Sequence, residues 1–224
     1  MLTMLLFAAS GMVGQGVLRE CLLHDRVGEV RAVVRRPLQN AHPKLRLIAT
    51  DDLTHPDDLV GVDVTSGSAG PSSNGMREPE YRRQTFELPL GIARAVAAAS
   101  PGSAFVYVSG AGTRRGSRMT WARVKAETED AVAALPLRTW MFRPGLIRPL
   151  HGIRPASRLY RVADVALRPV YLLVERIAPD QMTTTERIGR AALAVATGHA
   201  SPGVVTTAGI NALARTPGAQ HSGR

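Results

Sequence analysis

The chain has little cysteine, few aromatic side chains and no long apolar run. Its 224 residues include one cysteine, Cys21, which excludes an internal disulfide and suits a reducing compartment. Aromatic residues make up 4% of the sequence, although hydrophobic residues as a whole reach 45%. No apolar stretch has the roughly 18 residues that a membrane-spanning helix needs. We therefore predict a globular, cytoplasmic protein of one domain, with Cys21 as a small core residue.

Acidic residues are also scarce, with 18 against 28 basic residues and a net charge of +10. Such a charge suits nucleic acid, an anionic lipid surface or an anionic cofactor. The basic residues are scattered and mostly arginine, and no nucleic-acid-binding motif accompanies them. We therefore expect no nucleic acid partner and a basic surface that is mainly solvated. The first nine residues lack the basic start of a secretory signal peptide.

The most informative segment is a turn of small residues directly after the apolar run Met4–Phe7. Small residues let the backbone approach a pyrophosphate, and a helix that begins there directs its free N–H groups at the phosphates. Taken alone, a Gly-x-x-Gly pattern is weak evidence, but here it opens a chain of alternating strands and helices. The turn therefore predicts a dinucleotide site, formed by Ala8, Ser10, Gly11, Met12, Val13 and Gly14.

Apolar periodicity predicts this alternation of strands and helices. The predicted strands cover Leu2–Ala8, Glu29–Arg35, Leu45–Ala49, Ser103–Ser109 and Leu137–Phe142. The predicted helices cover Met12–Leu23, Pro79–Ser100 (kinked at Pro89 and Gly91) and Met119–Leu135. This order indicates an α/β fold, a doubly wound parallel sheet of the NAD(P)-binding Rossmann type. We divide it into a core at 1–150, a helical lid at 151–213 and a disordered tail at 214–224.

Val62–Gly70 fits this pattern poorly. It stands where a buried strand belongs, yet most of its residues are small or polar. Either a short strand runs into a loop here, or the sheet is weak at this point.

Residues after the second and third strands bear on the choice of cofactor. An NAD-preferring site would place an acidic residue at the end of the second strand, but this chain has Arg35 and Arg36. An arginine there can pair with a 2′-phosphate, so we predict NADP, with NAD as the alternative. Asp52 and Leu53 stand where a carboxylate could hold the adenine. The alternative for the arginines is a pair of solvated loop residues, and a helix-capping or loop aspartate is an equally good interpretation of Asp52.

Ser109 and Lys125 are the candidate catalytic residues. Ser109 ends a strong strand and precedes a Gly-rich turn, at the sheet edge where ligands bind. Lys125 follows Trp121 by four residues, so both lie on one face of the predicted helix. Ser109 could bind a substrate carbonyl and Lys125 the nicotinamide ribose. The alternatives are a turn-shaping serine and a surface lysine.

These residues resemble motifs of the short-chain dehydrogenase/reductase superfamily, in particular its atypical or extended members, which are epimerase/dehydratase-like or NmrA-like. The likeness rests on the Gly-rich turn, Tyr107-Val108-Ser109-Gly110, Lys125 and Arg143-Pro144-Gly145. It implies NAD(P) across the carboxyl edge of the sheet, with Pro144 and Gly145 beside the cofactor. In catalytic members a serine polarises the carbonyl, a tyrosine transfers the proton, and a lysine lowers the pKa of that tyrosine. Ser109 and Lys125 match the serine and the lysine.

The chain departs from this pattern at two positions of the site. Trp121 replaces the tyrosine, and an indole N–H donates a hydrogen bond but does not titrate usefully. Tyr107, two residues before Ser109, is the candidate substitute, and Thr113 and Thr120 are weaker ones. Ala8 replaces the first glycine, where a methyl group could cost about 1 kcal/mol.

Two functions follow from this pattern. The first is an NAD(P)-dependent oxidoreductase or epimerase-like enzyme that acts on a small carbonyl or alcohol, with Ser109, Lys125 and Tyr107 as catalytic residues. The second is a non-catalytic NADP-binding redox sensor or interaction protein. We predict no metal site, and a monomer and a homodimer both remain open.

The carboxyl-terminal third supports two readings. The stretch His151–Pro179 mixes arginines with apolar residues, which suits either a substrate lid or a basic helix in peripheral contact with an anionic membrane. His151 is read as a loop residue rather than a catalytic base. Thr183-Thr184-Thr185-Glu186 resembles a capping box that starts a helix running to Ala196.

Overall fold

The computed structural model describes residues 1–34, 41–50, 59–67, 76–153, 171, 174 and 176–219. Within them, seven parallel strands form one sheet in the order β3-β2-β1-β4-β5-β6-β9. The strands are β1 Leu2–Phe7, β2 Val27–Val34, β3 Leu45–Ala49, β4 Val64–Gly67, β5 Ala104–Val108, β6 Arg138–Arg143 and β9 Gly203–Thr206. The predicted Rossmann-type α/β fold is confirmed.

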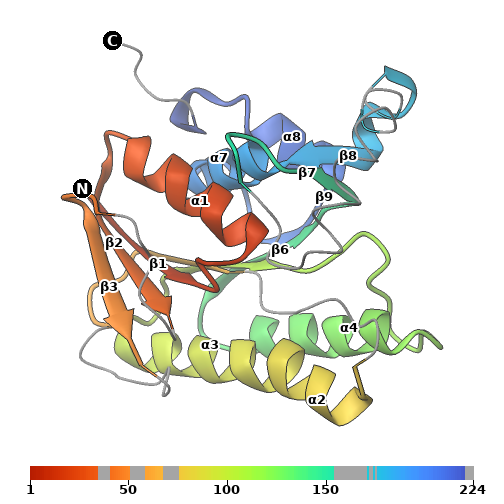
Figure 1. The fold of residues 1–224 in the computed structure, drawn as a ribbon. Helices are drawn as coiled ribbons and strands as arrows, with labels where there is room; N and C mark the ends of the chain where they lie inside the picture. The colour runs from red at the N-terminus through yellow and green to blue at the C-terminus, as the bar shows by residue number, and fades with distance from the viewer. Residues whose placement is uncertain are drawn as a thin grey trace.

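Helices cover both faces of the sheet (Figure 1). One face carries α1 Met12–Leu23, α7 Thr185–Ala196 and α8 Thr207–Leu213. The other carries α2 Glu78–Arg82, a π-helical turn Arg83–Glu87, α3 Leu88–Ala99 and α4 Thr120–Ala133. A separate two-stranded sheet pairs β7 Leu146–Arg148 with β8 Met182–Thr184, and short 3₁₀ turns cover Pro179–Gln181 and Pro217–Ala219. In the part of the chain described, no helix is both long and apolar enough to cross a membrane.

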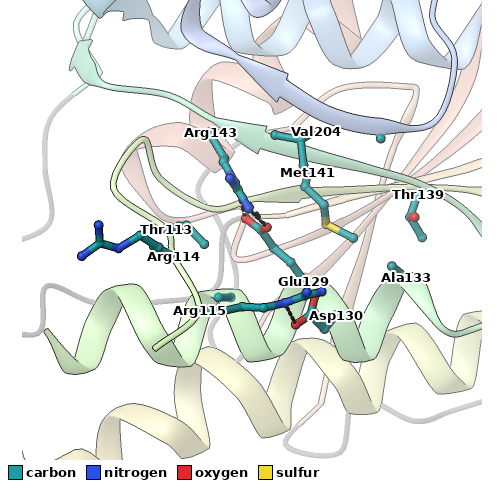
Figure 2. A pocket seen from close by; sticks show the side chains of 12 residues that line it. Thr113, Arg114, Arg115, Glu129, Asp130, Ala133, Thr139, Met141, Arg143 and Val204 are labelled. Atoms are coloured by element: carbon teal, nitrogen blue, oxygen red, sulfur yellow. Dashed lines mark hydrogen bonds and ion pairs between the residues drawn. The ribbon is translucent and has the colours of Figure 1, made fainter. Parts of the chain in front are cut away.

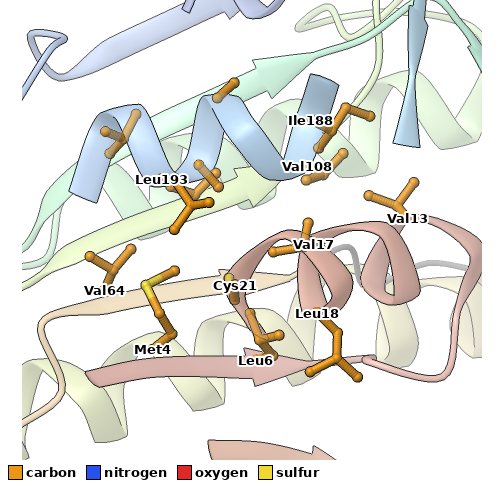
Figure 3. Close-up of a cluster of buried hydrophobic side chains, with 14 of the residues drawn as sticks. Met4, Leu6, Val13, Val17, Leu18, Cys21, Val64, Val108, Ile188 and Leu193 are labelled. Atoms are coloured by element: carbon orange, nitrogen blue, oxygen red, sulfur yellow. The ribbon is translucent and has the colours of Figure 1, made fainter. Parts of the chain in front are cut away.

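The larger core cluster lies between the sheet and helices α1 and α7 (Figure 3). Strand residues such as Leu6 and Val108 meet Val17 of α1 and Ile188 of α7. Cys21 is fully buried in this cluster, and burial raises the pKa of its thiol. It is therefore the core residue that the sequence predicted. The other face of the sheet has its own cluster under α3 and α4.

The segment that fitted poorly in the sequence forms strand β4 at the centre of the sheet. The strand is short, which confirms the first of the two predictions for this segment, and every residue in it is buried. Gly67 is required there because a Cβ would lie 2.5 Å from the ring of Phe7 on neighbouring β1. Small residues in β4 thus make room for a large residue in β1.

The long helix before β5 is interrupted by the π-helical turn rather than by a simple kink at Gly91. Pro89 has no N–H with which to bond the carbonyl of Thr85, four residues earlier. The Leu88 N–H donates instead to Arg83 O, five residues back. The Thr85 carbonyl accepts hydrogen bonds from Tyr107 Oη at 3.3 Å and Thr128 Oγ1 at 2.9 Å.

The carboxyl-terminal part differs from the prediction in three ways. Strand β9 completes the main sheet, so the core includes residues beyond 150. The predicted disorder from 214 is wrong as far as residue 219, because Pro217–Ala219 packs beside α7 and Ala219 is fully buried. The cap of α7 is Thr184, whose Oγ1 accepts from Arg187 N at 3.0 Å, so the capping box beginning at Thr183 is shifted by one residue.

Candidate functional site

The turn between β1 and α1 is tight. Ala8 adopts φ +57°, in the left-handed region, and its carbonyl accepts a hydrogen bond from Gly11 N at 3.0 Å. Gly14 lies directly against it, because a Cβ there would be 2.2 Å from Ala8 O and 2.8 Å from Ala9 Cα. The chain therefore keeps the tight turn with alanine at the first position, but needs glycine at Gly14.

The amino end of α1 is open toward this turn. Gly11 is the N-cap residue, and no described side chain caps the helix. The side chain of Gln15 donates to Ser10 O at 2.8 Å, which holds the turn without covering the helix end. Free N–H groups at an uncapped helix start suit an anionic ligand.

Four residues after the second and third strands carried the prediction of the cofactor type. Arg35, Arg36, Asp52 and Leu53 lie outside the described residues. The preference for NADP therefore remains a prediction from the sequence. Most of the Arg-rich stretch His151–Pro179 also lies outside them, so the lid and the membrane contact remain predictions as well.

Ser109 and Lys125 come together at the carboxyl end of β5. Lys125, on α4, donates from Nζ to Ser109 O at 2.6 Å. The Ser109 hydroxyl is 2.8 Å from Thr113 Oγ1, and both residues are buried. The predicted serine and lysine therefore share one site, and Thr113 fixes the serine hydroxyl rather than acting as a separate acid.

Burial lowers the pKa of Lys125 to about 8, and the carboxylate of Glu129 partly opposes this shift. Glu129 lies one helical turn further along α4 and is 5% exposed. Arg143 holds it with a bidentate ion pair that includes an Nε–Oε1 contact of 3.0 Å. Sequence reasoning missed Glu129, although its spacing of four residues from Lys125 was a usable signal.

Trp121 occupies the position that a catalytic tyrosine would take. Its ring lies over the Gly-rich turn, since a Cβ on Gly112 would be 2.4 Å from the indole. A Cβ on Gly110 would be 3.7 Å from the same ring and 3.8 Å from Lys125 Nζ. The indole is thus beside the lysine amine, in the arrangement that the spacing of the two residues predicted.

Tyr107 is not available as the substitute acid. Its side chain is completely buried on the α3 side of β5, and its hydroxyl donates to Thr85 O. Burial raises the pKa of Tyr107 well above its ordinary value. A buried phenol that already bonds the backbone does not reach the crevice, so the structure argues against its predicted catalytic role.

Arg143, Pro144 and Gly145 connect β6 to the turn after β5. Pro144 O accepts from Ala111 N at 2.9 Å, which joins this segment to the Gly-rich turn. Gly145 N donates to Thr207 Oγ1 at 2.9 Å, and a Cβ on Gly145 would lie 2.4 Å from Gln181 O. The predicted positions of Pro144 and Gly145 near the site are therefore consistent with the geometry.

A cavity of about 470 Å³ lies on the α4 side of β6, next to Thr113 (Figure 2). The Arg143–Glu129 pair crosses it, and Arg115 forms a second ion pair with Asp130. Its floor is apolar at Met141. Thr113 lines this cavity and also bonds Ser109, so the cavity and the serine are neighbours.

A charged cluster joins α1 to α7 on the opposite face. The carboxylate of Glu20 is fully buried and pairs with Arg19 and Arg190. Glu186 pairs with Arg190 at 2.9 Å and with His151, which adopts φ +56°. Arginines pair with these carboxylates, so the cluster connects α1 to α7 by ion pairs. His151 lies in a turn and contacts this cluster through Glu186.

No family model matches the chain. Among curated proteins, "Protein fmp52-1, mitochondrial" of Aspergillus oryzae is 33% identical over 165 residues, which is 68% of each chain. "Protein fmp52, mitochondrial" of Aspergillus niger is 30% identical over 190 residues, which covers 77% of this chain and 75% of the relative. The predicted cytoplasmic location is contradicted by these relatives, which are named mitochondrial.

Solved structures show the same fold at low identity. MoeE5 in complex with UDP-glucose and NAD has a TM-score of 0.64 and 18% identity, covering 96% of this chain and 82% of its own. WbmH of Bordetella bronchiseptica in complex with NAD+ has a TM-score of 0.68 and 14% identity, covering 92% and 74%. A short-chain dehydrogenase/reductase family oxidoreductase of Burkholderia thailandensis has a TM-score of 0.64 and 19% identity, covering 88% and 86%.

These neighbours confirm the predicted resemblance to the epimerase-like and short-chain dehydrogenase fold. The fungal relatives are at least 30% identical to this chain over more than two thirds of its length, which shows membership of their family. On this basis the chain belongs to the family of the fungal Fmp52 proteins.

Proposed function

We propose that this protein binds a nicotinamide dinucleotide at the carboxyl edge of its sheet and is an oxidoreductase of a small carbonyl or alcohol. The observation that carries the proposal is the tight turn at Ala8, which Gly14 allows because it places no Cβ against Ala8 O, and which leads into the uncapped start of α1. The printed titles of two structural neighbours, which hold NAD or NAD+, support it.

The residues fit such a cofactor by their chemistry. The N–H groups of Met12 and Val13, at the uncapped start of α1, would face the pyrophosphate. Lys125 would bind the nicotinamide ribose, and Ser109 would orient the carbonyl of the substrate. When bound, the reduced nicotinamide supplies a hydride for the carbonyl carbon.

We favour NADP over NAD within this proposal. The support is the pair Arg35 and Arg36 at the end of the second strand, where a guanidinium can pair with a 2′-phosphate. The charge of +10 also suits the more anionic cofactor.

The second candidate function is a non-catalytic NADP-binding sensor or interaction protein. A specific observation favours it: the indole of Trp121 fills the place of the proton-transferring tyrosine. This candidate keeps the cofactor site and predicts no turnover. We also propose two partners for the protein: an anionic membrane surface and a second copy of the chain.

Fluorescence titration with NADPH and, separately, NADH tests the proposal. Trp121 lies beside Gly110 and Gly112, so cofactor binding should quench its emission or transfer energy to the reduced nicotinamide. We expect a micromolar Kd, about −8 kcal/mol, for NADPH and weaker binding of NADH. Gly14→Ala serves as the variant with a disrupted turn, because its Cβ would be 2.2 Å from Ala8 O. Absence of binding by both cofactors would refute the cofactor site, whereas binding without turnover of any carbonyl in a panel would favour the sensor.

A further inference from the structure

Reduction of a carbonyl requires a proton as well as a hydride, and the usual donor is missing here. Trp121 replaces the tyrosine, and the hydroxyl of Tyr107 is buried against Thr85 O. The hydroxyls of Ser109 and Thr113 bond each other, and an unactivated hydroxyl has too high a pKa to serve as a general acid. A different group must supply the proton if the proposed function, on which this inference rests, is correct.

Lys125 is positioned to supply that proton. Its Nζ donates to the main-chain oxygen of Ser109 at 2.6 Å. The amine is therefore next to the residue whose hydroxyl would bind the substrate carbonyl. It is also 3.8 Å from the Cβ position of Gly110, in the turn beneath Trp121. An ammonium group has three N–H donors, and the bond to Ser109 O accounts for one of them. Gly110 places no side chain against the amine on the side of the turn.

We propose that Lys125 is the general acid of this site and replaces the missing tyrosine. As the carbonyl carbon receives the hydride, the C=O π bond breaks and its electron pair moves to the oxygen. That oxygen takes a proton from the Lys125 ammonium. The substrate becomes an alcohol, the reduced nicotinamide becomes oxidised, and Lys125 becomes a neutral amine that solvent reprotonates.

The surroundings of Lys125 suit this role. Burial lowers its pKa to about 8, so the ammonium holds its proton at neutral pH and yet releases it readily. The charged groups that face it are Glu129, which raises that pKa, and Arg143, which neutralises Glu129. Tyr107 and Tyr81 on the neighbouring elements have raised pKa values and stay uncharged. Lys125 is therefore the group at this site that titrates near neutral pH.

The composition of the chain makes Lys125 directly observable. The 28 basic residues include only two lysines, Lys44 and Lys125. Lys44 lies before β3 and donates to His24 O at 2.9 Å, away from the crevice. An arginine could hold a ribose or a carbonyl oxygen, but it does not release a proton under these conditions.

The first experiment is an NMR pH titration of the full chain labelled with ¹³C-lysine. It gives two side-chain signals, which the variant Lys44→Arg assigns. We expect the Lys125 signal to titrate near pH 8, well below the ordinary lysine value of about 10.4. Titration of Lys125 at the ordinary value would overturn the inference without reference to any substrate.

The second experiment measures cofactor binding and carbonyl reduction in Lys125→Arg, with Lys44→Arg as the matched control. Arginine keeps the charge, so NADPH affinity should change by no more than about threefold, while turnover should fall by about 10²- to 10⁴-fold. In the unmodified protein kcat/KM should fall as the pH rises through about 8, because the protonated amine is the active form. Lys44→Arg should leave both unchanged.

The outcomes separate this inference from the proposed function. Full turnover in Lys125→Arg, or a reduction rate independent of pH up to 10, would remove Lys125 as the acid and leave the oxidoreductase in place. No binding of NADPH or NADH by the unmodified protein would refute the proposed function itself. Cofactor binding with no reduction of any carbonyl would overturn the catalytic inference and leave the sensor.

Discussion

The substitution Gly14→Ala tests the cofactor turn most directly. The new Cβ would lie 2.2 Å from Ala8 O, 2.8 Å from Ala9 Cα and 2.9 Å from Ala8 C. All three are backbone atoms, so the turn and α1 must separate by more than about 1 Å to restore contact distances. Overpacking of this kind costs about 3 kcal/mol at the upper end of its usual range, while replacing glycine within a helix returns about 1 kcal/mol.

The expected net loss is about 2 kcal/mol, which lowers Tm by about 4–8 °C in a chain of this size. Gly91→Ala is the matched control, because Gly91 is also helical but a Cβ there meets no atom within 4 Å. That variant should be more stable by up to about 1 kcal/mol. Thermal unfolding followed by circular dichroism measures both changes.

NADPH titration completes the comparison. Gly14→Ala should bind at least about tenfold more weakly, which corresponds to 1.4 kcal/mol, and Gly91→Ala should bind normally. Gly16→Ala separates stability from binding, since its Cβ would be 2.6 Å from Thr185 O at the contact of α1 with α7, outside the turn. Equal stability and equal NADPH affinity in Gly14→Ala and the unmodified protein would refute the reasoning.

Two further substitutions test roles assigned to buried polar groups. Tyr107→Phe removes the hydrogen bond to Thr85 O and should cost about 1 kcal/mol in urea unfolding, with turnover and its pH profile unchanged; a large loss of turnover would restore Tyr107 as a catalytic residue. Burial tends to raise the pKa of Glu186, but His151 and Arg190 lower it below its ordinary 4.5, so this carboxylate stabilises the fold above that pH and ceases to do so on acidification. Glu186→Gln should therefore reduce Tm at pH 7, and the difference should shrink as the pH falls below the ordinary 4.5 and through the lowered pKa of Glu186. A difference that stays constant on acidification would contradict the pairing.

The first half of the fold could be predicted because its signals are local. The helix Met12–Leu23 and the strand Leu45–Ala49 were predicted with the observed bounds. Apolar runs and helical periodicity are properties of neighbouring residues, so they appear in the sequence without knowledge of the fold. The same applies to the turn at Ala8, which precedes a predicted helix. Its left-handed φ, however, appears only in the structure.

The carboxyl-terminal third depends on contacts between residues far apart in the chain. Strand β9 has exposed residues at three of its four positions, so no apolar run marks it, and only its pairing with β6 makes it a strand. The short strands β7 and β8 likewise form only by pairing with each other. Such pairing is a property of the fold and leaves little signal in local composition.

Within the site, the approach of Lys125 to Ser109 was predictable, whereas the ion pair of Glu129 with Arg143 was not. Lys125 follows from helical spacing and a strand end, which are local features. The ion pair joins α4 to the end of β6 across the layers of the fold. Tyr107 shows the same limit, because its position two residues before Ser109 could not reveal that its hydroxyl would donate to Thr85 O.

The two departures from the superfamily pattern affect the site differently. Ala8 differs from the superfamily's glycine in its side chain but has the left-handed backbone conformation that a glycine would supply. Gly14 still allows α1 to approach this turn closely. Trp121 departs in chemistry, and Gly112 leaves the space that its ring fills. The turn of the proposed cofactor site therefore keeps its shape, whereas the proposed site of proton transfer lacks a phenol. Because Lys125 lies next to the indole and beside Ser109, we expect the proposed reduction to depend on the proton of its ammonium group.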